Sequence, residues 1–402
     1  MSIALQLAGL VLLVLAIALA IPALVLFVEI VAALFARPHG EQEGTAPARP
    51  RFAVLMPAHD EAAGIAASIA TILPQLHSGD RLLVVADNCS DATAAAARGA
   101  GAEVVERHDL SHRGKGYALD FGVRALEGDC PPVVIVVDAD CSVDAQALHR
   151  LATRCAEVGR PVQALYLMHA PPGAGLRLRI AAFAWIVKNR ARPLGLLRLR
   201  LPCQLMGTGM AFPWELLRSA ALASGHLVED MQLGIDLAMA GAAPLFCPQA
   251  CVTSVFPSQA DGAAAQRTRW EHGHLSVIAS AGPRLLWRAL VQRRMSLLAL
   301  VLDLCVPPLA SLVLLTGGFA VLAWVLLLAG GSALPLWIAL CALAAVALGV
   351  LLAWRAHGRQ IVSLGELLAV PAYVLAKVPM YARLLRKRQV DWVRTKRDRG
   401  PD

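Results

Sequence analysis

The 402-residue sequence predicts an α/β domain built on a parallel sheet and joined to α-helical transmembrane segments. Two observations predict this fold class: short apolar runs alternate with Ala-rich stretches in the middle of the chain, and long charge-poor runs lie towards both ends. Hydrophobic residues make up 57% of the sequence and charged residues 16%, against about 45–50% and about 25% in soluble domains. This composition excludes a disordered chain and disfavours a purely soluble enzyme.

The amino-terminal apolar run is long enough to cross a bilayer. Residues 1–28 contain no charged side chain and lack the basic start of a cleaved signal peptide, so residues 1–36 are interpreted as a transmembrane anchor. Residues 37–51 form a polar linker. The next segment, residues 52–294, has the character of a cytoplasmic α/β domain, and hydrophobicity returns over residues 295–382.

Lys and Arg residues predict the orientation of these segments. Arg37, Arg49 and Arg51 follow the first span, which places the α/β domain on the cytoplasmic side. Long apolar stretches at 295–329 and 333–354 then lead out of the membrane and back. Asp303 and the pair Pro307 and Pro308 interrupt the first stretch, so the alternative there is a broken helix pair. A further crossing at 361–382 would carry the basic tail, residues 383–402, outside, so we expect an interfacial or re-entrant segment there and a cytoplasmic tail.

A second basic segment lies inside the α/β region. Residues 176–200 carry seven Lys or Arg and no acidic residue, beside apolar side chains such as Phe183 and Trp185. We interpret this segment as a contact with an anionic membrane surface; the alternative is a solvated cationic face. No zinc-finger, RRM or basic-region pattern supports nucleic-acid binding.

Three apolar runs predict buried strands, because continuous apolar runs between helices are typical of a parallel sheet covered on both faces. In such sheets ligands bind beyond the carboxyl ends of the strands, and polar residues follow each run here. The runs lie at 52–57, 81–86 and 132–137, the helical stretches at 61–76, 91–100 and near 116–127, and the polar groups at 59–61, 87–88 and 138–140.

The pair Asp138 and Asp140 is the sharpest single feature at this edge. Two carboxylates one residue apart after a buried strand can bind a hard divalent cation such as Mg²⁺ or Mn²⁺, which bridges phosphate oxygens. The alternative is a turn whose carboxylate caps the next helix. Asp87 also follows a strand and could be a helix cap, while Lys115 between two glycines resembles a phosphate contact outside any P-loop motif.

Two later motifs combine groups useful for transfer chemistry. Glu229 and Asp230 open a helical run, where they either complement the helix dipole or supply a general base. Gln266, Arg269 and Trp270 bring an amide, a guanidinium and an indole within five residues. Arginine suits phosphate oxygens and tryptophan suits the face of a sugar ring, although a plain amphipathic helix gives the same pattern.

Together, in this order, the motifs resemble the family 2 glycosyltransferases of bacterial inner membranes, which have a GT-A fold. The sequence is most similar to the cellulose, hyaluronan and poly-N-acetylglucosamine synthase group, over about residues 52–275. The matching pieces are VLMPAHDE (54–61), VVADNCSDAT (84–93), RGKG (113–116), VVDAD (136–140), MGTGMAF (206–212), VED (228–230) and QRTRW (266–270).

The resemblance implies a role for each matching residue. It implies catalysis by Asp230 as base, with Glu229 beside it, and a divalent metal, Mg²⁺ or Mn²⁺, held at the donor diphosphate. The remaining implied residues are Pro57, Ala58, Glu61, Asp87, Lys115 and Asp138 for the nucleotide, Asp138 and Asp140 for the metal, Gln266 and Arg269 for the diphosphate, and Trp270, Gly207 and Thr208 for the acceptor.

The implied function is transfer of a sugar, with inversion, from a UDP-sugar to a growing polysaccharide or a lipid-linked saccharide at the inner membrane. A homo-oligomer or an export partner would supply a channel, and single addition to a lipid-linked acceptor fits equally well. The alternative is a transporter or channel component with a catalytically degenerate domain. Asp303, Glu366 and Lys377 motivate it, because charges inside apolar segments often mark transport pathways.

Overall fold

The computed structural model describes residues 3–36, 49–226, 228–257 and 260–378, so the expected linker lies mostly, and the basic tail entirely, outside the described residues. The chain forms two compact units. The α/β unit holds residues 49–174 and 201–297 of the described chain, and the helical unit holds residues 3–36, 175–200 and 298–378.

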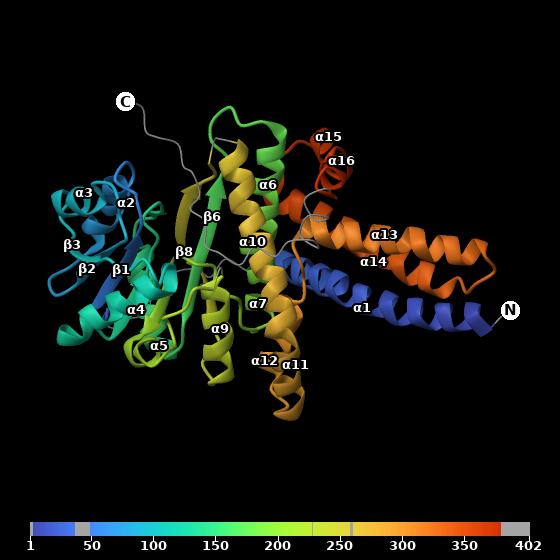
Figure 1. The fold of residues 1–402 in the computed structure, drawn as a ribbon, viewed down its shortest axis with the longest axis horizontal. Helices are drawn as coiled ribbons and strands as arrows, with labels where there is room; N and C mark the ends of the chain where they lie inside the picture. Colours follow the sequence, from blue (N-terminus) through green and yellow to red (C-terminus); the bar gives the residue numbers. More distant parts are fainter. Residues whose placement is uncertain (1–2, 37–48, 227, 258–259, 379–402) are drawn as a thin grey trace. The chain divides into compact units, whose positions relative to one another are not determined.

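A single eight-stranded sheet, ordered β3-β2-β1-β4-β7-β6-β8-β5, forms the α/β unit (Figure 1). The strands β3, β2, β1 and β4 are parallel. The sequence predicts β1, β2 and β4 of this set but not β3. Strand β7 is antiparallel to both of its neighbours, β6 and β8 are parallel, and β5 is antiparallel to β8. The strands are β1 Phe52–Ala58, β2 Arg81–Asp87, β3 Glu103–Arg107, β4 Val133–Val136, β5 Ser142–Val143, β6 Val162–His169, β7 Met210–Pro213 and β8 Leu245–Val255.

Buried side chains cover both faces of the parallel half of the sheet. Leu55 of β1 packs in a core with residues of three helices, α4, α8 and α9, while its neighbours Val54 and Met56, whose side chains alternate along the strand, are also fully buried. Helix α4 lies so close to the sheet that a Cβ at Gly122 would come within 2.3 Å of the Leu55 side chain. A side chain at position 122 would therefore force Leu55 and Val85 to shift, and glycine lets α4 pack against the sheet without this change.

The helices of this unit follow the strands and begin near their carboxyl ends. The predicted stretches at 61–76, 91–100 and near 116–127 correspond to α2 with η1, α3 and α4. The helices are α2 Ile65–Ile72, η1 Leu73–Gln75, α3 Thr93–Gly99, α4 Lys115–Leu126, η2 Glu127–Asp129, α5 Ala147–Val158, α8 Trp214–Arg218, α9 Glu229–Met239, α10 Ala260–Ser280 and α11 Gly282–Val291.

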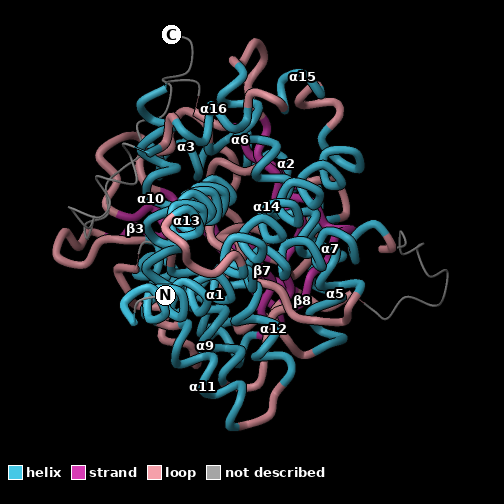
Figure 2. Tube along the Cα trace, turned by 90° about the vertical axis from the view of Figure 1, so that its right-hand side faces the viewer, coloured by secondary structure: helices cyan, strands magenta, loops and turns pink. Residues whose placement is uncertain are grey.

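The helical unit contains three helices long and apolar enough to cross a membrane: Leu5–Leu34, Leu309–Leu328 and Leu334–Gly358. They belong to α1, α13 and α14 with η4, which run side by side (Figure 1, Figure 2). The helices are α1 Ile3–Leu34, α6 Leu176–Ile186, η3 Val187–Ala191, α7 Arg192–Arg198, α12 Met295–Leu304, which begins in the α/β unit, α13 Leu309–Leu328, α14 Leu334–Ala353, η4 Trp354–Gly358, α15 Leu364–Leu367 and α16 Val370–Leu375.

The apolar stretch 295–329 is two helices rather than one. Pro307 and Pro308 separate α12 from α13, because proline lacks the N–H that would continue the helical hydrogen bonds. In the described part of 361–382, α15 and α16 are too short to span a bilayer. The interfacial or re-entrant placement of that segment stays a prediction.

The basic segment 176–200 packs with the apolar helices. Its Arg192 is buried: Nε donates to Glu29 Oε2 at 2.7 Å and Nη2 donates to Asp303 Oδ1 at 2.5 Å. Arg179 pairs with Glu366 in the same unit. Part of the charge expected on a cationic surface therefore neutralises acids of the apolar segments.

Candidate active site

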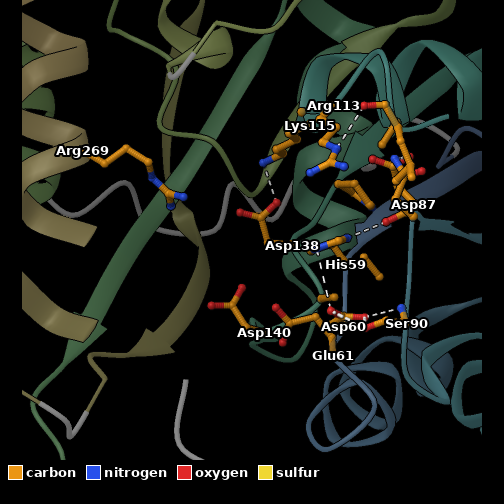
Figure 3. Close-up of a pocket in the computed structure, with 17 residues that line it drawn as sticks. His59, Asp60, Glu61, Asp87, Ser90, Arg113, Lys115, Asp138, Asp140 and Arg269 are labelled. Carbon is orange, nitrogen blue, oxygen red and sulfur yellow. Dashed lines mark hydrogen bonds and ion pairs between the residues drawn. The ribbon is translucent and has the colours of Figure 1, made fainter. Parts of the chain in front are cut away.

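A pocket of about 400 Å³ opens at the carboxyl ends of β1, β2 and β4 (Figure 3). It lies where the sequence places polar groups after each buried strand. Seven predicted site residues line it directly, together with Arg269 from α10, which extends towards the Asp138 and Asp140 carboxylates. The seven are Pro57, Ala58, Glu61, Asp87, Lys115, Asp138 and Asp140.

The loops after β1 and β2 are held together at one end of the pocket. Asp60, at φ +53°, accepts a hydrogen bond from the Ser90 backbone N–H at 2.6 Å. The Glu61 N–H donates to Thr93 Oγ1 at 2.8 Å, and His59 Nδ1 lies 2.7 Å from the Asp87 carbonyl oxygen. These contacts fix the pocket-facing backbone near Glu61, and Asp60 joins the loop after β1 to the loop after β2.

Asp87 is buried at the end of β2 and pairs with Arg107 at the end of β3. Arg107 Nη1 donates to Asp87 Oδ1 at 2.7 Å, and Asn88 Nδ2 donates to the same oxygen at 3.0 Å. Burial raises the pKa of Asp87 above its ordinary value, while the bond from Arg107 opposes that shift. The carboxyl is thus kept in contact with a fixed cation although it is removed from water.

Lys115 links two sets of carboxylates. Its Nζ lies 2.5 Å from Asp138 Oδ1 and 3.8 Å from Glu229 Oε1, and it donates to the Gly207 carbonyl at 2.6 Å. Burial by itself would lower the pKa of Lys115, but the charges of Asp138 and Glu229 raise it above the ordinary value. Lys115 is therefore a fixed positive charge between β4 and the start of α9.

Asp138 and Asp140 fit a hard divalent cation. One ligand atom from each lies within 4.8 Å of the other and of the Cys141 thiol. Ser254 donates to Asp140 Oδ2 at 3.2 Å, which orients this carboxylate. Burial, followed by the charge of Asp140, raises the pKa of Cys141 well above its ordinary value, so the thiol stays protonated and the two carboxylates are the suitable ligands.

Glu229 and Asp230 form the first turn of α9, where acidic side chains suit the helix dipole. Burial raises the pKa of Glu229 to about 7, the charge of Lys115 opposes this shift, and Asp230 adds to it. A Cβ at Gly207 would lie 3.4 Å from Asp230 Oδ2, so the Gly207 backbone borders this carboxylate. These two carboxylates can accept a proton next to Lys115, which lines the pocket.

The structure distributes the remaining predicted residues around the site. Thr208 is fully buried, and its hydroxyl accepts a hydrogen bond from the Asp138 N–H at 3.0 Å. Gln266 is buried on α10, and its Oε1 has no hydrogen-bond partner among the described residues. Trp270 is half-buried on the same helix and is not a pocket-lining residue, in contrast to Arg269.

Sequence reasoning missed the structural partners of several site residues. Arg107 is a lone arginine in no recognised motif, at the end of the short strand β3, whose sequence EVVER is too polar to predict a buried strand. Ser254 contacts Asp140 from β8, 114 positions along the chain, which no spacing pattern reveals. His59 and Arg113 line the pocket beside residues of predicted motifs.

The fold and the site are those of an α/β enzyme with carboxylates and fixed cations at the carboxyl ends of its parallel strands. Residues 50–273 match the family model "Glycosyltransferase like family 2". The chain therefore belongs to this family and is a glycosyltransferase. A glycosyltransferase of uncharacterised function from Mycobacterium tuberculosis is 32% identical over 183 residues, covering 42% of this chain and 79% of that protein, and a Mycobacterium bovis protein gives the same values.

Two solved structures are also similar to this chain. A mannosyltransferase from Pyrobaculum calidifontis, in complex with GDP-Man and Mn²⁺, has a TM-score of 0.47 at 19% identity, over 85% of this chain and 99% of that chain. A glucosyl-3-phosphoglycerate synthase from Mycobacterium tuberculosis, in complex with Mn²⁺, UDP-glucose and phosphoglyceric acid, has a TM-score of 0.36 at 26% identity, over 52% and 74%.

Proposed function

We propose that this glycosyltransferase transfers a sugar, with inversion, from a UDP-sugar to a growing polysaccharide or a lipid-linked saccharide at the bacterial inner membrane. The position of Lys115 carries the proposal. It contacts Asp138, at the expected donor diphosphate, and lies 3.8 Å from Glu229, next to the proposed base Asp230. The groups proposed to bind the donor diphosphate and the base proposed to activate the acceptor hydroxyl therefore lie in one site.

In the proposed reaction, Asp230 accepts the proton of the acceptor hydroxyl as that oxygen attacks the anomeric carbon. The diphosphate leaves from the opposite face, so one displacement inverts the configuration. Lys115 and Arg269 stabilise the negative charge that develops on the leaving group. Asp138 and Asp140 would hold Mg²⁺ or Mn²⁺, which when bound supplies further charge stabilisation to the diphosphate.

The other site residues take positioning roles in this proposal. The ends of β1 and β2, with Pro57, Ala58, Glu61 and Asp87, hold the nucleotide. Gln266, a buried amide with an unpartnered oxygen among the described residues, assists Arg269 at the diphosphate. Gly207 and Trp270 shape the acceptor path, and Thr208 supports it by holding the Asp138 backbone.

Membrane attachment is proposed from the apolar helices and from α11. The helices α1, α13 and α14 supply the spans, with 52–294 as the cytoplasmic catalytic domain. Helix α11 exposes an apolar face next to basic residues, which suits an anionic bilayer surface. This face comprises Leu286, Trp287, Leu290 and Val291, and the basic residues are Arg284 and Arg288.

The transporter alternative is weakened because two of the charges that motivate it, Asp303 and Glu366, form ion pairs. Asp303 pairs with Arg192, and Glu366 pairs with Arg179 and forms a capping box with Ser363, the N-cap of α15. Charges neutralised by a neighbouring segment of the same unit have a structural explanation, so they do not require a transport pathway. A homo-oligomer or an export partner stays a proposal for a polymer-forming enzyme.

UDP release tests the proposal. We would incubate the full-length protein in nanodiscs with a panel of UDP-sugars, Mn²⁺ or Mg²⁺, and membrane lipid extract as the acceptor source. We expect turnover with one donor, loss with EDTA and loss in Asp140→Asn, with the exposed Asp144→Asn as control. The absence of both turnover and UDP binding with every donor tested would contradict the proposal. The size of the product would distinguish polymer synthesis from single addition.

A further inference from the structure

A network of hydrogen bonds joins the ends of β2 and β3 at the pocket. Asp87 and Arg107 are direct neighbours in the strand register. The buried Arg107 also donates from Nη2 to Asp109 Oδ2 at 3.0 Å and to the His112 carbonyl oxygen at 2.9 Å. Its guanidinium lies 5.5 Å from the centre of the Tyr117 ring. Arg107 therefore fixes both Asp87 and the loop that leads to Lys115.

The two oxygens of Asp87 have different surroundings. Oδ1 accepts from Arg107 at 2.7 Å and from Asn88 at 3.0 Å. A carboxylate oxygen offers about two acceptor positions, so Oδ1 is fully used. Within the described chain, Oδ2 has no protein hydrogen bond, and Asp87 lines the pocket. Asp87 therefore offers one acceptor oxygen to a ligand.

Nucleobases differ in the groups they would offer to such an acceptor. Uracil has one N–H, at N3, between two carbonyl groups. Guanine has two adjacent donors, N1–H and the N2 amino group, which suit both oxygens of a carboxylate. Cytosine and adenine carry an unprotonated ring nitrogen at the corresponding edge, which repels a carboxylate oxygen.

We propose that Arg107 is a positioning residue that selects uracil, by occupying Oδ1 of Asp87 together with Asn88 and leaving only Oδ2 for the N3–H of the base. This inference rests on the proposed use of a UDP-sugar donor and deepens it by naming the residue that makes the site select uracil. The side chain of Arg107 contacts Asp87 rather than the base, so its effect passes through the orientation and charge of that carboxylate.

The charges around Asp87 add a pH signature to the proposal. Burial raises the pKa of Asp87, whereas Arg107 and, more weakly, His59 lower it. Asp109 faces Arg107 from the loop after β3 and shares its positive charge. Because Oδ1 already accepts from Arg107 and Asn88, a proton on Asp87 would sit on Oδ2 and turn the acceptor that faces the N3–H into a donor, so UDP binding weakens as pH falls. Loss of Arg107 raises the pKa further and moves this weakening to higher pH.

Asp87→Asn gives the sharpest test, because Arg107 needs an oxygen at the Oδ1 position. The amide would then turn its NH₂ group to the pocket and present a donor in place of an acceptor. We expect the ratio of CDP to UDP affinity, measured by calorimetry on the full-length protein with Mn²⁺, to rise about tenfold or more. N3-methyl-UDP should bind the wild type about tenfold more weakly than UDP does.

The arginine itself is tested by Arg107→Met and Arg107→Lys. We expect Arg107→Met to bind UDP about tenfold more weakly at pH 6, with the affinity recovering towards pH 8.5 and the preference over GDP reduced. The UDP affinity of Arg107→Lys should lie between that of Arg107→Met and that of the wild type. Arg81→Met is the matched control, because Arg81 pairs with Glu103 across the same two strands at their other end.

The outcomes separate this inference from the proposed function. An unchanged ratio of CDP to UDP affinity in Asp87→Asn, or an unchanged pH profile in a folded Arg107→Met, would overturn the role of Arg107 while donor turnover persists. A wild type that prefers GDP would overturn the choice of uracil. Absence of both nucleotide binding and turnover would instead contradict the proposed function itself. If Arg107→Met does not fold, the Asp87→Asn ratio still decides.

Discussion

Gly207 borders Asp230 so closely that a Cβ at this glycine would lie 3.4 Å from Asp230 Oδ2 and 3.9 Å from Lys115 Nζ. Its φ of +93° is one that residues with a side chain rarely adopt. Both facts indicate that the backbone at Gly207 leaves room for a substrate group next to the proposed base.

Gly207→Ala should therefore reduce sugar transfer about tenfold or more while UDP binding changes little, because the new methyl group occupies the acceptor side of Asp230. Gly241→Ala is a matched control: its φ is +108°, and a Cβ there would have no heavy atom of the described chain within 4 Å beyond its immediate neighbours. Equal losses of transfer in the two folded variants would show that backbone strain, rather than the position beside Asp230, is responsible.

Lys115 is predicted to act as a fixed cation at the donor diphosphate. Lys115→Met should lower kcat/KM for the UDP-sugar about 100-fold, because it removes the positive charge between Asp138 and Glu229. Lys115→Arg should restore part of this loss, limited by the larger guanidinium. Initial rates of UDP release measure both variants, and near-wild-type kcat/KM in Lys115→Met would contradict the assigned role.

Glu229 should make stability depend on pH. Its pKa is about 7 in the folded protein and 4.5 ordinarily, so between these values the folded state binds more protons than the unfolded state. The ionisation of Glu229 therefore reduces stability as pH rises from about 4.5 to 7. Glu229→Gln lacks this ionisation, and its Tm relative to wild type should increase over that window and then level off.

Thermal unfolding of the full-length protein from pH 4.5 to 8 measures this difference. Glu215→Gln, at an exposed position on α8, is the control for replacing a glutamate by glutamine. A pH-independent difference in Tm between Glu229→Gln and wild type would mean that the carboxyl of Glu229 is not strongly affected by its burial.

The buried triad of the helical unit should contribute to stability only as an intact set. Arg192→Met would leave Glu29 and Asp303 buried without their cation, with an expected cost of about 3–5 kcal/mol. The combined variant Glu29→Gln, Arg192→Met, Asp303→Asn should recover much of that loss. Arg198→Met, exposed on the same helix, should change stability by about 0.5 kcal/mol or less.

The variants are compared by heating each protein in detergent and measuring the folded protein that remains by size-exclusion chromatography. A triple variant as unstable as Arg192→Met would show that the triad stabilises the helices through the pairing itself.

Strands β1, β2 and β4 of the sheet were predictable because they are continuous apolar runs followed by polar groups. Phe52–Ala58 and Arg81–Asp87 match the predicted strands closely. The other strands were not predicted: β3 has the polar sequence EVVER, β7 has four residues, β5 has two, and β8 contains Pro248 and pairs with β6 in parallel through a register shift. Short or irregular strands carry too little periodicity to be recognised.

The pocket-lining residues of the parallel edge were predictable from their motifs, whereas their supporting partners were not. Arg107 pairs with Asp87 across 20 positions, and Arg192 pairs with Asp303 across 111. Local sequence gives Asp303 the appearance of a charge exposed in a membrane, and only the packing of helices distant in sequence supplies its partner. Ion pairs formed by tertiary contact leave no signal in spacing.

The most direct test of the account compares Asp230→Asn with Asp236→Asn, an exposed position on the same helix. The measurement is single-turnover transfer of labelled sugar together with the Kd of the UDP-sugar. We predict that Asp230→Asn keeps a Kd within a few-fold of wild type but transfers sugar about 100-fold or more slowly, whereas Asp236→Asn matches wild type in both. Transfer at the wild-type rate by Asp230→Asn would contradict the assignment of Asp230 as the base.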